Sequence, residues 1–205
     1  MKTRYPRVVL PLLLAAITVL LAACGGDEVS SPANSEATGI DRAFVEAMIP
    51  HHESAVEMAE MAQQRARHTE VKNLAEAIVE TQNAEIDTMK TMAAEMEKTG
   101  VKKGDLGMDM DNMGMGGDIA SLEKAEPFDR EFIDMMIPHH QGAIRMARMQ
   151  LDEGKDPEVR KLAQAIIDAQ AKEIDAMSTW RVDWYGGLSP AGGVPAEAHG
   201  GAEHP

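Results

Sequence analysis

The sequence predicts an all-α fold, a four-helix bundle made of two duplicated antiparallel helical hairpins. Three features predict it: aromatic residues make up only 3% of the 205-residue chain, helix-forming Ala, Met, Glu and Lys are abundant, and one helical unit occurs twice. The net charge of −14 argues against nucleic-acid binding, because a phosphate backbone requires a basic surface. The single cysteine excludes a disulfide scaffold and an all-cysteine metal site.

Residues 1–23 have the layout of a secretory signal peptide. Three basic residues within the first seven precede an apolar stretch, Val8 to Leu21, which is too short and wrongly flanked for a stable membrane span. Leu21-Ala22-Ala23-Cys24 resembles a bacterial lipobox, which implies cleavage before Cys24 and lipidation of its sulfur. An ordinary signal peptide with an incidental cysteine is the alternative. We therefore expect an extracytoplasmic protein of the bacterial cell envelope, held to the membrane by a lipid, with residues 24–40 as a lipidated flexible tether.

The folded part contains an internal repeat, whose two copies are offset by 88 residues. Of the 18 positions of Phe44–Met61, 10 are identical in Phe132–Met149. Of the 23 positions of Glu70–Met92, 12 are identical in Glu158–Trp180. A single helical hairpin cannot bury its apolar stripe alone, so we expect the two copies to close on each other.

Each copy is predicted to form two helices joined by a short turn. In the first copy these are predicted at 41–67 and 69–98, ended by Gly100, and in the second copy Asp156-Pro157-Glu158 is a specific start signal. Pro50 and Pro138 each either kink a helix or begin a new one after a short turn. The predicted organisation is a hairpin at 41–100, a Met/Gly-rich linker at 101–127, a second hairpin at 128–185 and a disordered tail at 186–205.

Eight polar residues fall within or beside the apolar stripes of these helices: His51, His52, Gln82 and Glu85, with His139, His140, Gln170 and Glu173 at the matching positions of the second copy. A buried carboxylate has to find a partner or take up a proton. One interpretation is a hydrogen-bonded network that fixes helix register. The other is a metal site with imidazole and carboxylate ligands oriented by glutamine, a donor set that suits Zn, Cu, Fe or Ni.

Methionine favours copper among these metals. Met58, Met89, Met146 and Met177 share or border the histidine-bearing faces, and thioethers prefer soft Cu(I), although core filling is the commoner role of such a stripe. The linker segment 107–116 adds four methionines without helical periodicity: Met108, Met110, Met113 and Met115. We interpret this segment as a secondary soft-metal loop.

The paired Met-Ile-Pro-His-His and Gln-Xaa-Xaa-Glu-Ile-Asp-Xaa-Met segments resemble the domain of unknown function 305 family over Asp41 to Trp180. The resemblance implies a ferritin-like architecture, export from a bacterial cytoplasm, and an association with copper binding and tolerance. It also implies the metal-binding residues, which are His51, His52, Met58, Gln82, Glu85, Met89, His139, His140, Met146, Gln170, Glu173 and Met177. The second copy has Trp180 where the first has Met92, so a sulfur donor is lost there.

Three functions follow from these patterns. The leading hypothesis is an extracytoplasmic metal-binding lipoprotein without catalytic residues that holds copper, with Cu(I) favoured, for buffering or for delivery to a copper-handling protein. The second is a ferritin-like di-metal oxidoreductase, for which the core is poor in carboxylates and lacks a Glu-Xaa-Xaa-His motif. The third is a metal-free helical interaction module.

Overall fold

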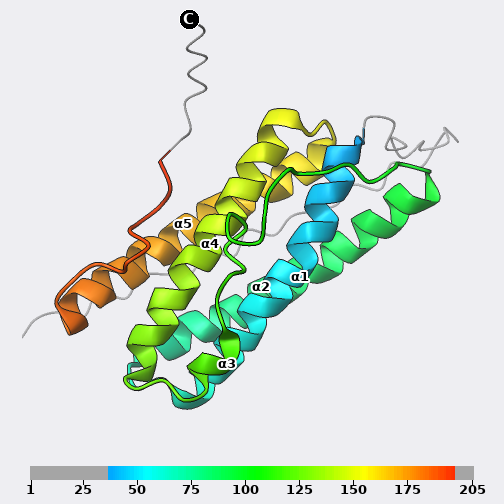
Figure 1. Ribbon diagram of the computed structural model, residues 1–205. Helices are drawn as coiled ribbons and strands as arrows, with labels where there is room; N and C mark the ends of the chain where they lie inside the picture. Colours follow the sequence, from blue (N-terminus) through cyan, green and yellow to red (C-terminus); the bar gives the residue numbers. More distant parts are fainter. Residues whose placement is uncertain (1–36, 197–205) are drawn as a thin grey trace, which may run out of the picture. The chain divides into compact units, whose positions relative to one another are not determined.

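Two long helical hairpins are joined by an extended segment (Figure 1). The computed structural model describes residues 37–196. Its helices are α1 (Gly39–Arg65), α2 (Thr69–Lys98), the single-turn α3 (Ile119–Leu122), α4 (Phe128–Glu153) and α5 (Pro157–Tyr185). These described residues contain no strand, so the predicted all-α class is confirmed. The predicted signal peptide, Cys24, most of the tether and tail residues 197–205 lie outside the described residues.

A capping box fixes the start of α1. The Thr38 hydroxyl accepts a hydrogen bond from the backbone N–H of Asp41, and the Asp41 carboxylate accepts one from the backbone N–H of Thr38 at 2.7 Å. As a result α1 begins at Gly39, two residues earlier than the sequence predicts. It ends at Arg65, also two residues before the predicted end.

The Asp-Pro-Glu signal of the second copy begins α5 as predicted. The Asp156 carboxylate accepts hydrogen bonds from the backbone N–H groups of Glu158 at 2.9 Å and Val159 at 3.2 Å, and Pro157 occupies the first helical position. Gly186, with a φ of 74°, ends the helix in the left-handed conformation.

Pro50 and Pro138 lie inside helices that continue through them, so neither proline begins a new helix. Each proline lacks the N–H that would bond to the carbonyl four residues earlier. This local loss of a backbone hydrogen bond comes directly before each pair of histidines.

The α1–α2 and α4–α5 hairpins pack on each other mainly through α1 and α4. Two apolar clusters form the core, one around Phe132 and Ile78 and the other around Phe44 and Ile166. The apolar stripe of α1 is fully buried: Phe44, Met48, Ala55, Ala59 and Ala62. The histidine pairs occur where α1 and α4 pass from one cluster into the other. No helix within residues 37–196 is long and apolar enough to cross a membrane.

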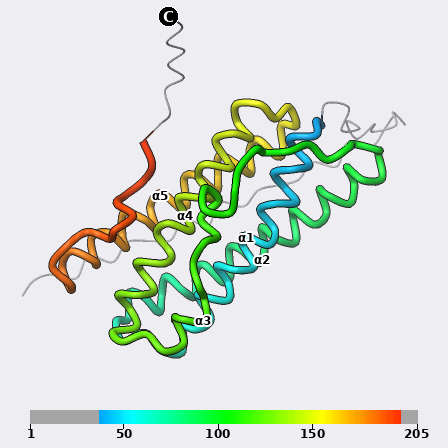
Figure 2. The backbone as a smooth tube through the Cα atoms, in the orientation of Figure 1, coloured from blue at the N-terminus to red at the C-terminus, as the bar shows by residue number. Residues whose placement is uncertain are grey.

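The linker between the hairpins runs back along α1 (Figure 2). Near its start, the backbone N–H of Gly104 donates to the carbonyl of Gly39 at 2.8 Å. Near its end, the Arg65 guanidinium donates to the carbonyl of Leu122 at 2.8 Å. The predicted Met/Gly-rich linker is therefore a packed element that follows α1 from its first turn to its last.

Residues 191–196 lie against α4, within the segment that the sequence predicts to be a disordered tail from residue 186. The Gln141 amide donates to the carbonyls of Ala191 at 2.9 Å and Gly193 at 2.6 Å, and the Arg148 guanidinium donates to that of Ala196 at 2.9 Å. Polar side chains on the outer face of α4 thus satisfy carbonyls of a segment whose composition alone suggests flexibility.

Each hairpin begins with a buried aspartate that holds the turn of the other hairpin. The Asp41 carboxylate accepts hydrogen bonds at 3.1 Å from the backbone N–H groups of Lys155 and Asp156, which join α4 to α5. The Asp129 carboxylate, 88 positions later, accepts them at 2.9 Å from those of Arg67 and His68, which join α1 to α2. These two reciprocal contacts, which we call the aspartate latches, fix the register of one hairpin against the other.

Burial by itself raises the pKa of the Asp41 carboxyl, but hydrogen bonds from Thr38 and Gln150 outweigh it and hold the pKa below its ordinary value. The carboxylate is therefore charged at neutral pH, where it stabilises the fold. That stabilisation is present above the ordinary carboxyl pKa and is lost as the pH falls through the lowered pKa of the folded state.

We expect Asp41→Asn and Asp129→Asn each to lower the free energy of unfolding by about 2 kcal/mol at neutral pH, since each variant loses charge-assisted hydrogen bonds to buried amides. Urea denaturation followed by circular dichroism measures this loss. The matched control is Asp87→Asn on the exposed face of α2, which should change stability by less than about 0.5 kcal/mol. The Asp41→Asn effect should shrink as the pH falls below about 4, and an effect that persisted in acid would contradict this account.

Candidate metal centre

Four buried imidazoles form a row across the α1–α4 contact. The ring centroids of His52 and His51 are 6.2 Å apart, those of His51 and His139 are 3.8 Å apart, and those of His139 and His140 are 6.3 Å apart. All four residues are at most 3% exposed. The structure therefore brings the predicted histidines from both copies together in the core.

The two outer histidines are each held by a glutamate. His52 Nε2 donates to Glu85 Oε2 at 2.8 Å, and His140 Nε2 donates to Glu173 Oε2 at 2.6 Å. In a neutral ring this leaves a lone pair on Nδ1, and both Nδ1 atoms are buried without a hydrogen-bond partner among the described residues. Carboxylates orient metal-binding histidines in this way. The predicted glutamates thus contact ring nitrogens.

Gln82 and Gln170 lie one helical turn before these glutamates and are also buried. The side-chain carbonyl oxygen of each has no hydrogen-bond partner within the described part of the chain. A buried polar atom without a partner is costly, so each such oxygen is available to a ligand or to water.

The two inner histidines are neutral at physiological pH. Burial, and next the charge of His52, lowers the pKa of His51 to about 3, and burial together with the charge of His51 lowers the pKa of His139 well below its ordinary value. His51 Nε2 donates to the carbonyl of Met113 in the linker at 2.9 Å. Neither ring nitrogen of His139 has a partner among the described residues, which makes this imidazole the most clearly unsatisfied polar group of the core.

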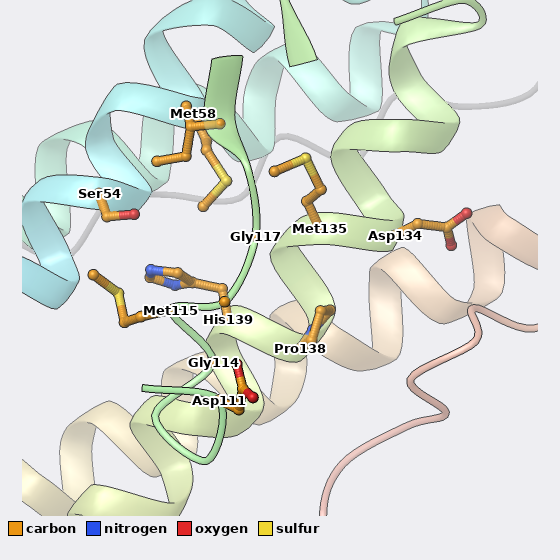
Figure 3. Close-up of a pocket in the computed structure, with 12 residues that line it drawn as sticks. Ser54, Met58, Asp111, Gly114, Met115, Gly117, Asp134, Met135, Pro138 and His139 are labelled. Carbon is orange, nitrogen blue, oxygen red and sulfur yellow. The ribbon is translucent and has the colours of Figure 1, made fainter. Parts of the chain in front are cut away.

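A cavity of about 370 Å³ lies beside His139. Three thioethers from different elements line it together with the imidazole: Met58 of α1, Met115 of the linker and Met135 of α4 (Figure 3). Within residues 37–196, no group of three His, Cys, Asp or Glu side chains is placed to hold an ion. The donors that line this cavity are one imidazole and three thioethers, and such a set suits a soft monovalent ion.

Met135 is not among the predicted site residues. It precedes His139 by four residues, so the two side chains share one face of α4. Their spacing is the signal that could have identified it, but the adjacent Met136 fits the apolar stripe and is indeed fully buried in the core. In the first copy the matching position is Ala47, so the sulfur donor exists in one copy only.

The other predicted methionines lie elsewhere. Met89, Met146 and Met177 are fully buried in the two apolar clusters and do not line the cavity. Of the linker methionines, Met108 and Met113 pack partly buried against the Phe44 cluster, and Met110 is 58% exposed. Only Met58, Met115 and His139 of the predicted set line the cavity.

The linker fills the place beside His51 that would match the cavity beside His139. A Cβ atom built at Gly142 would lie 1.8 Å from the carbonyl oxygen of Met113, so only glycine permits this approach. Gly114, with a φ of 76°, also lies against the carbonyl of Pro138. The position matching Gly142 in the first copy is Ser54, which lines the open cavity. The two halves of the site are therefore unequal, one open and one covered.

The family model described as "Domain of unknown function (DUF305)" matches residues 26–93 and 41–181. CopM in its Cu(I)-bound form is 42% identical to this chain, with a TM-score of 0.61, and the match covers 71% of this chain and 98% of CopM. CopM has also been crystallised in Cu(II)-bound and Ag-bound forms.

One further solved structure and one curated sequence are also similar to this chain. A DUF305 fragment from Deinococcus radiodurans is 31% identical, with a TM-score of 0.59, over 70% of this chain and 95% of the fragment. The uncharacterized protein L153 of Acanthamoeba polyphaga mimivirus is 39% identical over 51 residues, which are 25% of this chain and 34% of the viral protein. This chain thus spans about a third of that curated relative.

We expect Gly142→Ala to push the linker away from α4, since the added methyl group collides with the Met113 carbonyl. Hydrogen exchange at the amides of Met113 and Met115 should become at least about tenfold faster, and the free energy of unfolding should fall by about 1–3 kcal/mol. Gly187→Ala is the control, because a Cβ atom there meets nothing within 4 Å. Unchanged exchange at both amides in Gly142→Ala would show that the linker does not depend on this contact.

Proposed function

This chain belongs to the DUF305 family, and from that premise we propose that it binds copper as Cu(I) in the cavity beside His139. The observation that carries the proposal is the convergence of an unpartnered, buried imidazole with the thioethers of Met58, Met115 and Met135. The likeness to CopM, which has been crystallised with Cu(I) and Ag, supports the same class of soft ion.

The chemistry of these donors favours Cu(I). Thioethers and a neutral imidazole carry no charge, so one monovalent cation adds a single charge to a largely apolar cavity, where a divalent ion would be more costly. No thiol competes, because the only cysteine is Cys24. Glu85 and Glu173 orient the two outer rings of the histidine row, those of His52 and His140.

A carboxylate-bridged pair of ions is less compatible with this geometry. Glu85 and Glu173 lie on different hairpins, and each accepts a hydrogen bond from a histidine of its own hairpin. Neither carboxylate is free to bridge two ions without giving up its histidine. Binding and release of copper, rather than oxidative turnover, is the activity we propose.

We further propose that the protein is a lipoprotein of the bacterial cell envelope, in which residues 1–23 are removed, Cys24 is lipidated and the residues from Cys24 to Ala37 form the tether, which ends where Thr38 caps α1. The motif around Cys24 supports this arrangement. A domain held outside the cytoplasm in this way would buffer copper there, or deliver it to a copper-handling protein.

Met58 and Met146 provide a matched test of the copper site, because they occupy equivalent positions of the two copies and only Met58 lines the cavity. Met58→Leu should weaken Cu(I) binding by about tenfold or more, whereas Met146→Leu should leave the affinity unchanged. Competition with a chromophoric Cu(I) chelator under anaerobic, reducing conditions measures both. His139→Ala should abolish tight binding, and equal losses in the two Met variants would place the ion elsewhere.

Cys24→Ser tests the anchor. In the native bacterium the variant should move from the membrane fraction to the soluble extracytoplasmic fraction, since it lacks the sulfur that carries the lipid. Immunoblotting of fractionated cells detects this change, and mass spectrometry of the wild-type N-terminal peptide identifies the lipid. Ser35→Ala in the tether is the control, and a wild-type protein that was already soluble would refute the anchor.

A further inference from the structure

The methionine-rich part of the linker folds into one closed helical turn. The Asp109 side chain accepts the backbone N–H of Asn112 at 2.8 Å, which caps the start of the turn. Gly114, in the left-handed conformation, ends it, and its N–H donates to the carbonyl of Asp111 at 2.9 Å. This segment therefore has a defined backbone conformation.

The closing hydrogen bond of this turn joins the backbones of two methionines. The N–H of Met115 donates to the carbonyl of Met110 at 2.9 Å, five residues earlier. Together with the left-handed Gly114 this is the pattern of a Schellman motif, in which the side chains at these two positions commonly contact each other. Met110 and Met115 are therefore neighbours in space.

The two thioethers differ in their surroundings. Met110 is 58% exposed, whereas Met115 is half-buried and lines the cavity with His139 and Met58. An exposed thioether, that of Met110, thus belongs to the same turn as Met115, which lines the cavity together with the unpartnered imidazole. A lone exposed methionine needs no explanation, but one fixed beside a cavity-lining methionine has a defined relation to the site.

The turn is also fixed in place on α4. Arg145 Nε donates to the carbonyl of Asn112 at 2.7 Å, and Gly114 lies against the carbonyl of Pro138. Asp111 lines the cavity beside Met115, and its negative charge favours the approach of a cation. The backbone of Met110 is therefore held in place, hydrogen-bonded to that of a residue that lines the cavity.

We propose that Met110 is the uptake ligand, the first donor to bind Cu(I) as it is transferred from an external carrier to the cavity. The Met110 sulfur replaces one donor of the carrier, and the Met115 sulfur and the His139 imidazole then replace the remaining ones, so that the carrier leaves. The Met110 sulfur is released last, when Met58 and Met135 complete the bound state in the cavity. Copper stays Cu(I) throughout, so no oxidant or reductant takes part. This inference rests on the proposed copper site, and it assigns Met110 to the rate of loading and Met115 to the stability of the loaded state.

Transfer of Cu(I) from its bicinchoninate complex to the full-length protein tests this assignment. Stopped-flow absorbance gives the transfer rate, at protein concentrations where the wild-type rate rises linearly with protein, so that release from the chelator is not limiting. Met110→Leu should slow transfer by about fivefold or more and leave the equilibrium affinity within about twofold. Met115→Leu should weaken the affinity by about tenfold or more.

Met108→Leu, in the same loop but packed partly buried against the core, is the matched control and should leave rate and affinity unchanged. Thermal unfolding of the copper-free variants checks that all of them fold. An unchanged transfer rate in Met110→Leu, with wild-type affinity, overturns the uptake role and leaves the copper site standing. An affinity loss in Met110→Leu equal to that of Met115→Leu makes Met110 a resident ligand and also overturns it. A wild-type protein that takes up no Cu(I) rejects the proposed function itself.

Discussion

Four imidazoles buried where α1 packs on α4 impose the main constraint on this structure. A buried ring nitrogen without a partner is costly, and the core provides partners for only some of these atoms. Glu85 and Glu173 satisfy one nitrogen of each outer ring, and the Met113 carbonyl satisfies one of His51. The burial of the remaining nitrogens without a partner costs free energy, which either the packing of the surrounding helices or a bound ligand has to offset.

The aspartate latches provide the rigidity that such a row requires. Because Asp41 contacts the turn between α4 and α5, and Asp129 contacts the turn between α1 and α2, a slip of one hairpin past the other would break both sets of hydrogen bonds. The same slip would separate His51 from His139, whose rings are 3.8 Å apart. The stability of the fold and the geometry of the candidate site therefore depend on the same register.

The sequence predicts the helices of this fold better than the contacts between distant parts of the chain. Periodicity and capping residues predict the four helices and the inward direction of the histidines, because these features depend on neighbours within a few turns. The latches join residues that are 61 to 115 positions apart in the sequence. From the sequence alone, Asp41 is therefore only an acidic residue at the start of a helix, and its long-range partner is not evident. Periodicity does not identify Met135 for a related reason: its role depends on a cavity that α1 and the linker complete.

Duplication followed by a single linker explains why the two halves of the site differ. Two related hairpins would offer two equivalent places beside the inner histidines, but one linker can cover only one of them. Here it lies on Gly142 and covers His51, while the place beside His139 stays open and is lined by Ser54 and Met135. The same linker also supplies Met115 to the open side. The segment that breaks the symmetry of the repeat thus provides His51 with a hydrogen-bond partner, the Met113 carbonyl, and places the sulfur donor Met115 in the cavity beside His139.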